Sequence, residues 1–133
     1  MIYVFIPAFN EQESIEELVK STISVLENSN LEFKILVIND GSTDNTKIIL
    51  EKFNGNSNFI LLNHKTNKGL GETERNGFEY LAEISNSEDY IVRVEGDDTH
   101  NPKFILKIIK KLDEGFDVVN TSRFAKGGSQ VGL

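Results

Sequence analysis

The sequence predicts an α/β fold with a mostly parallel sheet flanked by helices, and three observations predict it. Short apolar runs alternate with amphipathic segments along the 133 residues. A polar turn follows each apolar run. Strands that alternate with helices favour parallel pairing through right-handed crossovers. We therefore expect five strands and four helices built around one sheet.

Five apolar runs have the length and composition of buried strands. The expected strands cover residues 3–6, 33–38, 59–62, 90–94 and 117–120. Four segments between them place apolar side chains at helical spacing. The expected helices cover about residues 10–28, 42–53, 71–84 and 101–112. In the third helix we expect the buried side to be formed by Leu70, Gly77, Leu81 and Ile84.

Polar residues and one proline mark where the helices are expected to begin. Asn10 and Glu13 have the spacing of a capping box, so the first helix is expected to begin at Asn10. The second helix is expected to begin at Ser42 or Asp44. Pro102 occupies the first helical position of the fourth helix, where its missing N–H has no cost.

Composition excludes several classes of protein. Asp and Glu number 21 against 14 Lys and Arg, so the formal net charge is −7. This balance lacks the basic surface of a nucleic-acid-binding protein. The absence of cysteine excludes a disulfide scaffold and a thiolate metal site. No apolar run approaches the roughly 20 residues that span a bilayer, and residues 1–7 lack the basic region of a signal peptide.

Polar segments follow each expected strand and should meet at the carboxyl edge of the sheet, where α/β proteins bind ligands. These segments are residues 7–11, 39–44, 63–69, 95–100 and 121–123. In this set we interpret His64 as a loop residue without a role and His100 as a residue close to the acidic cluster. Gly69-Leu70-Gly71 lacks the third glycine of a dinucleotide-binding loop, so we interpret it as the entry to a helix.

The cluster Glu95-Gly96-Asp97-Asp98 is the most informative polar segment. Glu95 and Asp97 point to the same side if strand geometry continues, and Gly96 lets a ligand approach the backbone. Paired carboxylates suit Mg²⁺ or Mn²⁺, with Thr99 as a further oxygen ligand. The alternative is a solvated acidic turn. The position at the end of a buried strand favours the metal site.

Six segments in this order resemble family 2 glycosyltransferases of the Rossmann-like GT-A nucleotide-diphospho-sugar transferase fold. They are residues 4–11, the turn at 38–46 that contains Asn39-Asp40-Gly41-Ser42-Thr43-Asp44, 67–69 followed by 75–77, 95–97, 101–102 and 121–124. The last of them is similar to a segment of dolichol-phosphate mannosyltransferases and other polyprenyl-phosphate sugar transferases. Asn39 and Glu95 stand where that family has aspartates, which leaves the inner metal ligands open.

The resemblance implies a role for each matched residue. It implies a nucleotide-sugar donor site formed by Pro7, Phe9, Glu11, Asp40, Lys68, Glu95, Gly96, Asp97 and Arg123. It implies that Mg²⁺ or Mn²⁺ is held by Glu95, Asp97 and Thr99. Asp97 and Arg123 would act in catalysis, and no general base can be named. Asp40 would bond the base or the ribose of the donor, which is GDP- or UDP-linked.

The resemblance also implies an inverting hexosyltransferase whose acceptor is a polyprenyl or dolichyl phosphate. A glycan or other hydroxyl acceptor stays open, as does a nucleotide-sugar-binding fragment without turnover. Residues 1–133 are expected to be the donor-binding front of a longer enzyme whose acceptor part follows. We expect that enzyme to act in cell envelope glycan synthesis, in the cytoplasm or at the cytoplasmic face of the membrane.

Overall fold

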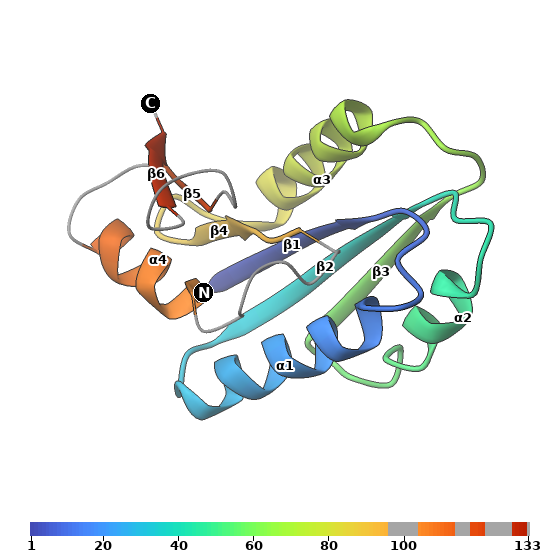
Figure 1. Ribbon diagram of the computed structural model, residues 1–133. Coiled ribbons are helices and arrows are strands. Elements are labelled where there is room, and N and C mark those ends of the chain that lie inside the picture. The colour runs from blue at the N-terminus through green and yellow to red at the C-terminus, as the bar shows by residue number, and fades with distance from the viewer. Residues whose placement is uncertain (96–103, 114–117, 122–128, 133) are drawn as a thin grey trace.

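A computed structural model describes residues 1–95, 104–113, 118–121 and 129–132. Its main sheet has four parallel strands in the order β3-β2-β1-β4 (Figure 1). The strands are β1 (Ile2–Ala8), β2 (Phe33–Asp40), β3 (Phe59–His64) and β4 (Tyr90–Arg93). The helices are α1 (Ile15–Asn28), α2 (Thr46–Glu51), α3 (Leu70–Ile84) and α4 (Phe104–Asp113). The predicted α/β class with a mostly parallel sheet is confirmed.

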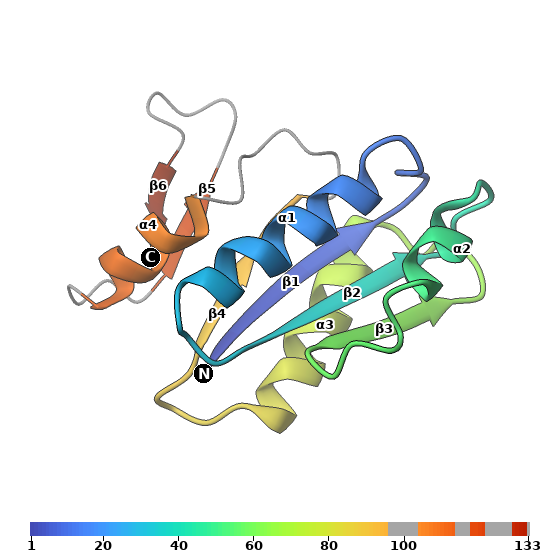
Figure 2. The same cartoon turned by 90° about the horizontal axis from the view of Figure 1, so that it is seen from below.

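The sheet lies between two unequal layers of helices (Figures 1 and 2). The larger core cluster joins α1, α2 and α4 to one face of the sheet through residues such as Val4, Leu18 and Ile105. On the other face, α3 is the one helix among the described elements that packs against Phe5, Leu36 and other side chains of the strands. Because strand side chains alternate, the even-numbered residues of β2 face α3, and Asp40 at the end of the strand is one of them.

The close approach of α3 to the sheet depends on Gly77. A methyl group added to Gly77 would lie 2.3 Å from Cζ of Phe5. Phe5 also meets Phe78 edge to face, with ring centroids 5.6 Å apart. The buried residues of α3 are Thr73, Gly77 and Leu81. The expected stripe is therefore partly wrong, since Leu70 and Ile84 are both exposed.

The fifth expected strand does not join the main sheet. Residues Val118–Thr121 form β5, which pairs antiparallel with β6 (Ser129–Gly132) in a separate two-stranded sheet. A second strand only seven residues further along the chain can pair with β5 as a hairpin, whereas joining the parallel sheet uses a longer crossover. The sequence offered no apolar run at 129–132 to signal this partner.

One predicted helix start is also wrong. Asn10 has a left-handed backbone with φ of 51°, and its Oδ1 accepts the N–H of Thr43 at 2.8 Å. It therefore cannot cap α1, which begins four residues after Glu11. Of the two starts expected for the second helix, Asp44 is the closer one, because its Oδ1 accepts the N–H of Thr46 at 2.9 Å and α2 begins at Thr46. Within the described ranges, no helix has the length and apolar character needed to cross a membrane.

Candidate functional site

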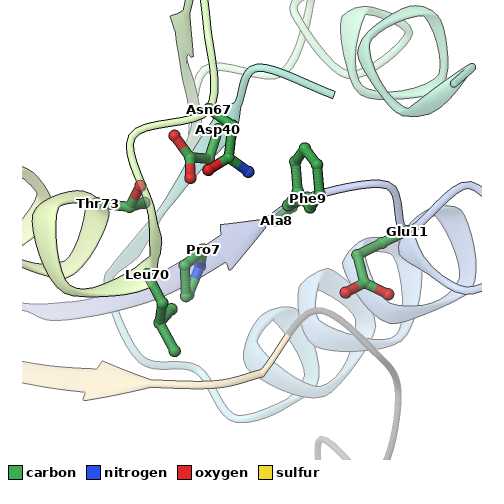
Figure 3. Close-up of a pocket in the computed structure, with 8 residues that line it drawn as sticks. All are labelled: Pro7, Ala8, Phe9, Glu11, Asp40, Asn67, Leu70 and Thr73. Carbon is green, nitrogen blue, oxygen red and sulfur yellow. The ribbon is translucent and has the colours of Figure 1, made fainter. Parts of the chain in front are cut away.

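A cavity of about 190 Å³ lies at the carboxyl edge of the main sheet, beyond β1 and β2 and beside the first turn of α3 (Figure 3). This is the edge where ligands bind in parallel α/β sheets. Its lining combines apolar side chains with a few polar groups, as ligand sites usually do. The lining residues are Pro7, Ala8, Phe9, Glu11, Asp40, Asn67, Leu70 and Thr73.

Asp40 is the buried charged residue in the lining of this cavity. It ends β2 and is only 4% exposed. Its Oδ1 accepts the backbone N–H of Lys68 at 2.9 Å, and its Oδ2 accepts that of Gly69 at 3.0 Å. Burial acts to raise the pKa of Asp40, but hydrogen bonds from His64 and these two amides together hold it below its ordinary value. The carboxylate is therefore ionised at neutral pH.

Two glycines bring those amides to Asp40. Gly41 has φ of +70°, and a Cβ there would lie 2.4 Å from the backbone N of Asn67. Gly69 has φ of +93° and immediately precedes α3. Glycine adopts such angles without steric cost. The segment before α3 therefore packs directly on the turn after β2, and its N–H groups point at the carboxylate.

His64 completes the hydrogen bonds of Asp40. It is the last residue of β3 and lies opposite Asp40 in the parallel register. Its Nδ1 is 2.8 Å from Asp40 Oδ1, and its Nε2 is 3.1 Å from Nδ2 of Asn76 on α3. The interpretation of His64 as a loop residue is wrong, because it ends β3. Its position opposite Asp40 depends on how β3 pairs with β2, which the sequence around His64 does not indicate.

Thr73 is the polar residue that sequence reasoning missed. Its side chain is buried at the first turns of α3 and points toward Asp40 (Figure 3). The hydroxyl lies close enough to lower the pKa of Asp40, yet it makes no hydrogen bond of normal geometry to a described residue. A buried hydroxyl without a partner costs about 1–3 kcal/mol. Thr73 lies four residues before Gly77 and therefore on the same face of the helix. Because Gly77 was expected on the buried side, this spacing could have predicted that Thr73 is buried too.

Pro7 at the end of β1, and Phe9 and Glu11 on the loop between β1 and α1, line the cavity. Their predicted role at a nucleoside stays a prediction. The exposed ring of Phe9 rises beside Asn67 in Figure 3. This loop is bonded to the turn before α2. The Glu11 N–H donates to Thr46 Oγ1 at 2.9 Å. The Asn10 N–H donates to Ser42 Oγ at 2.9 Å.

The acidic end of β4 has a different character. Glu95 Oε1 lies 3.9 Å from Arg93 Nη1, and Arg93 Nε lies 2.6 Å from Glu74 Oε1 on α3. Glu95 is thus on the α3 side of the sheet, as Asp40 is. Among the described residues, no three His, Cys, Asp or Glu side chains gather as a metal site. The predicted positions Gly96, Asp97, Thr99 and Arg123 lie outside the described residues.

Lys68 contributes through its backbone. Its N–H bonds Asp40, while its side chain is exposed and does not line the cavity. The predicted role of the Lys68 ammonium near a diphosphate stays a prediction. The residues brought together at the cavity are therefore Pro7, Phe9, Glu11 and Asp40 from the predicted set.

Comparison with known proteins places these observations in a family. The sequence matches the model of "Glycosyl transferase family 2" over residues 3–132. Glucosyl-3-phosphoglycerate synthase from Mycobacterium tuberculosis in complex with UDP is a similar solved structure, with a TM-score of 0.70 and 22% identity. The match covers 95% of this chain and 45% of that one.

A second similar protein is S. aureus TarS. Its 1–349 fragment in complex with UDP-GlcNAc matches with a TM-score of 0.66 and 22% identity, over 94% of this chain and 36% of that one. The same M. tuberculosis synthase with Mn²⁺, UDP and phosphoglyceric acid gives 0.64 and 23%, over 84% and 38%. This chain therefore spans less than half of the solved chains it resembles. At these identities the likeness shows a common fold.

Proposed function

This chain belongs to glycosyl transferase family 2, and we propose that it forms the donor-binding part of an inverting glycosyltransferase. The enzyme transfers a sugar from a nucleoside diphosphate to an acceptor, for which we favour a polyprenyl or dolichyl phosphate. The observation that carries the proposal is the cavity at the carboxyl edge of the sheet, with the buried, ionised carboxylate of Asp40 in its lining.

The chemistry of the cavity suits a nucleobase that carries a ring N–H beside a carbonyl group. An ionised carboxylate only accepts hydrogen bonds, so Asp40 pairs with an N–H, and the Thr73 hydroxyl can donate to the adjacent carbonyl oxygen. Uracil and guanine both present this edge. The base would lie against the exposed ring of Phe9. The similar structures of TarS and of the M. tuberculosis synthase contain UDP, which favours uracil.

The acidic segment after β4 would take the diphosphate. A chain with a net charge of −7 repels an anionic donor unless a cation intervenes. Glu95, Asp97 and Thr99 would hold Mg²⁺ or Mn²⁺, because hard oxygen ligands suit these ions. Glu95 fits this use, since its side chain is about one-third exposed and lies 3.9 Å from the nearest Arg93 nitrogen. When bound, the ion neutralises charge on the diphosphate.

Transfer then needs a nucleophile and stabilisation of the leaving group. An acceptor phosphate oxygen attacks the anomeric carbon as the bond to the diphosphate oxygen breaks, and the bonding electrons stay on the diphosphate. A phosphate is already anionic, so no strong general base is required. Asp97 would act through the metal, and Arg123 would pair with phosphate oxygens. Support for this acceptor comes from residues 102–105 and 122–124, since the segment 121–124 resembles one in polyprenyl-phosphate sugar transferases.

Thermal unfolding with UDP, GDP, ADP and CDP tests the donor, each measured with and without Mn²⁺. We expect UDP or GDP to raise the melting temperature, more so with Mn²⁺, and ADP and CDP to have little effect. Equal stabilisation by all four would contradict base recognition at Asp40. Folded protein that responds to none of them would contradict the proposed function.

The acceptor requires a separate assay. Radiolabelled donor sugar, with the base identified above, is incubated with a polyprenyl phosphate and in parallel with a glycan acceptor. We expect label in the lipid fraction. Label in the glycan alone would replace the lipid phosphate by a hydroxyl acceptor. Binding without transfer to either would assign nucleotide binding alone to these 133 residues.

A further inference from the structure

Three side chains from three elements form a continuous chain of hydrogen bonds behind the cavity. Asn76 on α3 is bonded to His64 at the end of β3, and His64 is bonded to Asp40 at the end of β2. The side chains of His64 and Asp40 are 11% and 5% exposed. Of these three, only Asp40 lines the cavity. His64 and Asn76 therefore act on a ligand only through Asp40.

The partners fix which nitrogen of His64 carries the proton. An ionised carboxylate accepts only, so Nδ1 of His64 must donate to Asp40 Oδ1. In a neutral imidazole Nε2 is then an acceptor, and the Nδ2 amide of Asn76 supplies its hydrogen bond. The chain runs in one direction, from Asn76 through His64 to Asp40. Neutral imidazole in water favours the other tautomer, so this arrangement is imposed by its neighbours.

These bonds leave Asp40 with a defined remaining capacity. Oδ1 accepts His64 Nδ1 and the Lys68 N–H, while Oδ2 accepts the Gly69 N–H. Each carboxylate oxygen has two acceptor positions. One position on Oδ2 is left by these three bonds, and the buried Thr73 hydroxyl lies close to the same carboxylate. The carboxylate cannot rotate without breaking several bonds at once.

We propose that His64 and Asn76 are positioning residues that hold the Asp40 carboxylate in one orientation, so that a single oxygen position recognises the N–H of the donor base. This inference rests on the proposed function and adds the residues that set its base recognition. Without His64, Oδ1 would lose a charge-assisted hydrogen bond and compete with Oδ2 for the ligand. Recognition of the base would weaken, whereas recognition of the diphosphate would not change.

Two substitutions at His64 separate positioning from packing. His64→Phe keeps a planar ring of similar size but donates nothing to Asp40. His64→Asn is smaller, yet its amide Nδ2 occupies nearly the place of the imidazole Nδ1 and restores the donor. Asn63→Ala is the matched control, because Asn63 precedes His64 and bonds Asn39 on the opposite face of the sheet at 3.0 Å.

Isothermal titration with UDP, GDP and inorganic pyrophosphate, all with Mn²⁺, measures the effect on this chain. We expect His64→Phe to weaken the preferred nucleotide about tenfold, which corresponds to about 1.4 kcal/mol. His64→Asn should recover most of that loss, and Asn63→Ala should resemble the wild type. Pyrophosphate binding should stay within about twofold throughout, because a tenfold change is the expected signal.

Each outcome decides between the two proposals. Nucleotide binding by His64→Phe equal to the wild type, or no recovery in His64→Asn, would overturn the positioning role and leave the proposed function standing. A wild type that binds neither nucleotide would overturn the proposed function and this inference with it. If His64→Phe does not fold, Asn76→Ala replaces it, with a smaller loss expected in the same direction.

A nitrogen–proton correlation spectrum of the wild type reads the tautomer directly. In the neutral imidazole, we expect His64 to carry its proton on Nδ1. Its signals should shift when the nucleotide binds and should move to the other tautomer in Asp40→Leu. Protonation on Nε2 in the wild type would overturn the proposal.

Discussion

Asp40 ends β2 and Glu95 follows β4, the two strands that flank β1. Both residues lie on the side of the sheet that α3 covers, yet their surroundings differ. Asp40 is 4% exposed and accepts hydrogen bonds from three donors. The Glu95 side chain is 33% exposed and faces one guanidinium at 3.9 Å. The protein itself therefore completes the first carboxylate. Among the described residues, the second has only this longer charged contact, which suits a carboxylate that takes an outside partner such as a cation.

This difference indicates which part of a nucleotide-sugar donor each carboxylate would bind. A preformed carboxylate suits a neutral base, whose recognition depends on the geometry of a few hydrogen bonds. A half-exposed carboxylate suits a hydrated cation, whose ligands can adjust. We call Asp40 with its hydrogen-bond donors the preformed side of the site, and Glu95 with Arg93 the adaptable side. Each substitution below changes one of these two sides.

Gly41→Ala should have the largest effect on the preformed side. The new Cβ would lie 2.4 Å from backbone atoms of the Thr66–Asn67 segment, at a φ of +70°. We expect a loss of about 3 kcal/mol in the free energy of unfolding, measured by urea denaturation. Gly55→Ala is the matched control, since its Cβ would meet nothing within 4 Å. Equal stability of the two variants would contradict the packing described for this turn.

Gly77→Ala should have an intermediate effect. Alanine gains about 1 kcal/mol over glycine in a helix, but the added methyl group would lie 2.3 Å from the ring of Phe5. We expect a net loss of about 1–2 kcal/mol because a packed core resists overfilling. Gly71→Ala, in the same helix with open space at its Cβ, should gain stability. Thermal unfolding of both variants checks whether the position of α3 depends on Gly77.

Acid should weaken the preformed side in a defined direction. Burial raises the pKa of Asp40, but its hydrogen bonds outweigh burial and lower it overall. Because the folded pKa lies below the unfolded one, the stabilisation is complete above the ordinary Asp pKa of about 3.9 and is lost as the pH falls through the folded value. Urea denaturation at a series of pH values should show a shallower acid dependence in Asp40→Asn. Parallel curves would contradict this assignment.

Arg93→Gln should have the smallest effect on stability and should act on the adaptable side. The Arg93–Glu74 pair is partly exposed, so its loss should cost about 0.5–1 kcal/mol. Removal of the positive charge beside Glu95 should strengthen Mn²⁺ binding modestly, as titration calorimetry would show. Weaker Mn²⁺ binding would mean that Arg93 orients Glu95 for the ion.

The sequence was sufficient for features set by local period and by the end of each strand. The alternation of strands and helices placed Pro7, Phe9, Glu11 and Asp40 at one edge, and these four line the cavity. Asn10 at a position typical of a helix cap was misleading, because its amide bonds a loop 33 residues away. Local pattern contains no record of that partner.

Features that depend on tertiary register could not be predicted in this way. His64 gains its role only because β3 pairs with β2 so that it lies opposite Asp40. Thr73 faces the cavity only because Gly77 lets α3 approach Phe5. The strand β5 pairs with β6 in a separate sheet because β6 follows it closely, and no apolar run in the sequence predicted β6. In each case the deciding contact joins segments that no short window of sequence includes.

Titration of the wild type and Asp40→Asn with UDP and GDP in the presence of Mn²⁺ tests the central claim most directly. Asparagine keeps the size of the side chain but replaces one acceptor oxygen by a donor. The account predicts at least about tenfold weaker binding of the preferred nucleotide, with inorganic pyrophosphate bound as in the wild type. Nucleotide binding that is unchanged in Asp40→Asn would contradict recognition of the base by this carboxylate.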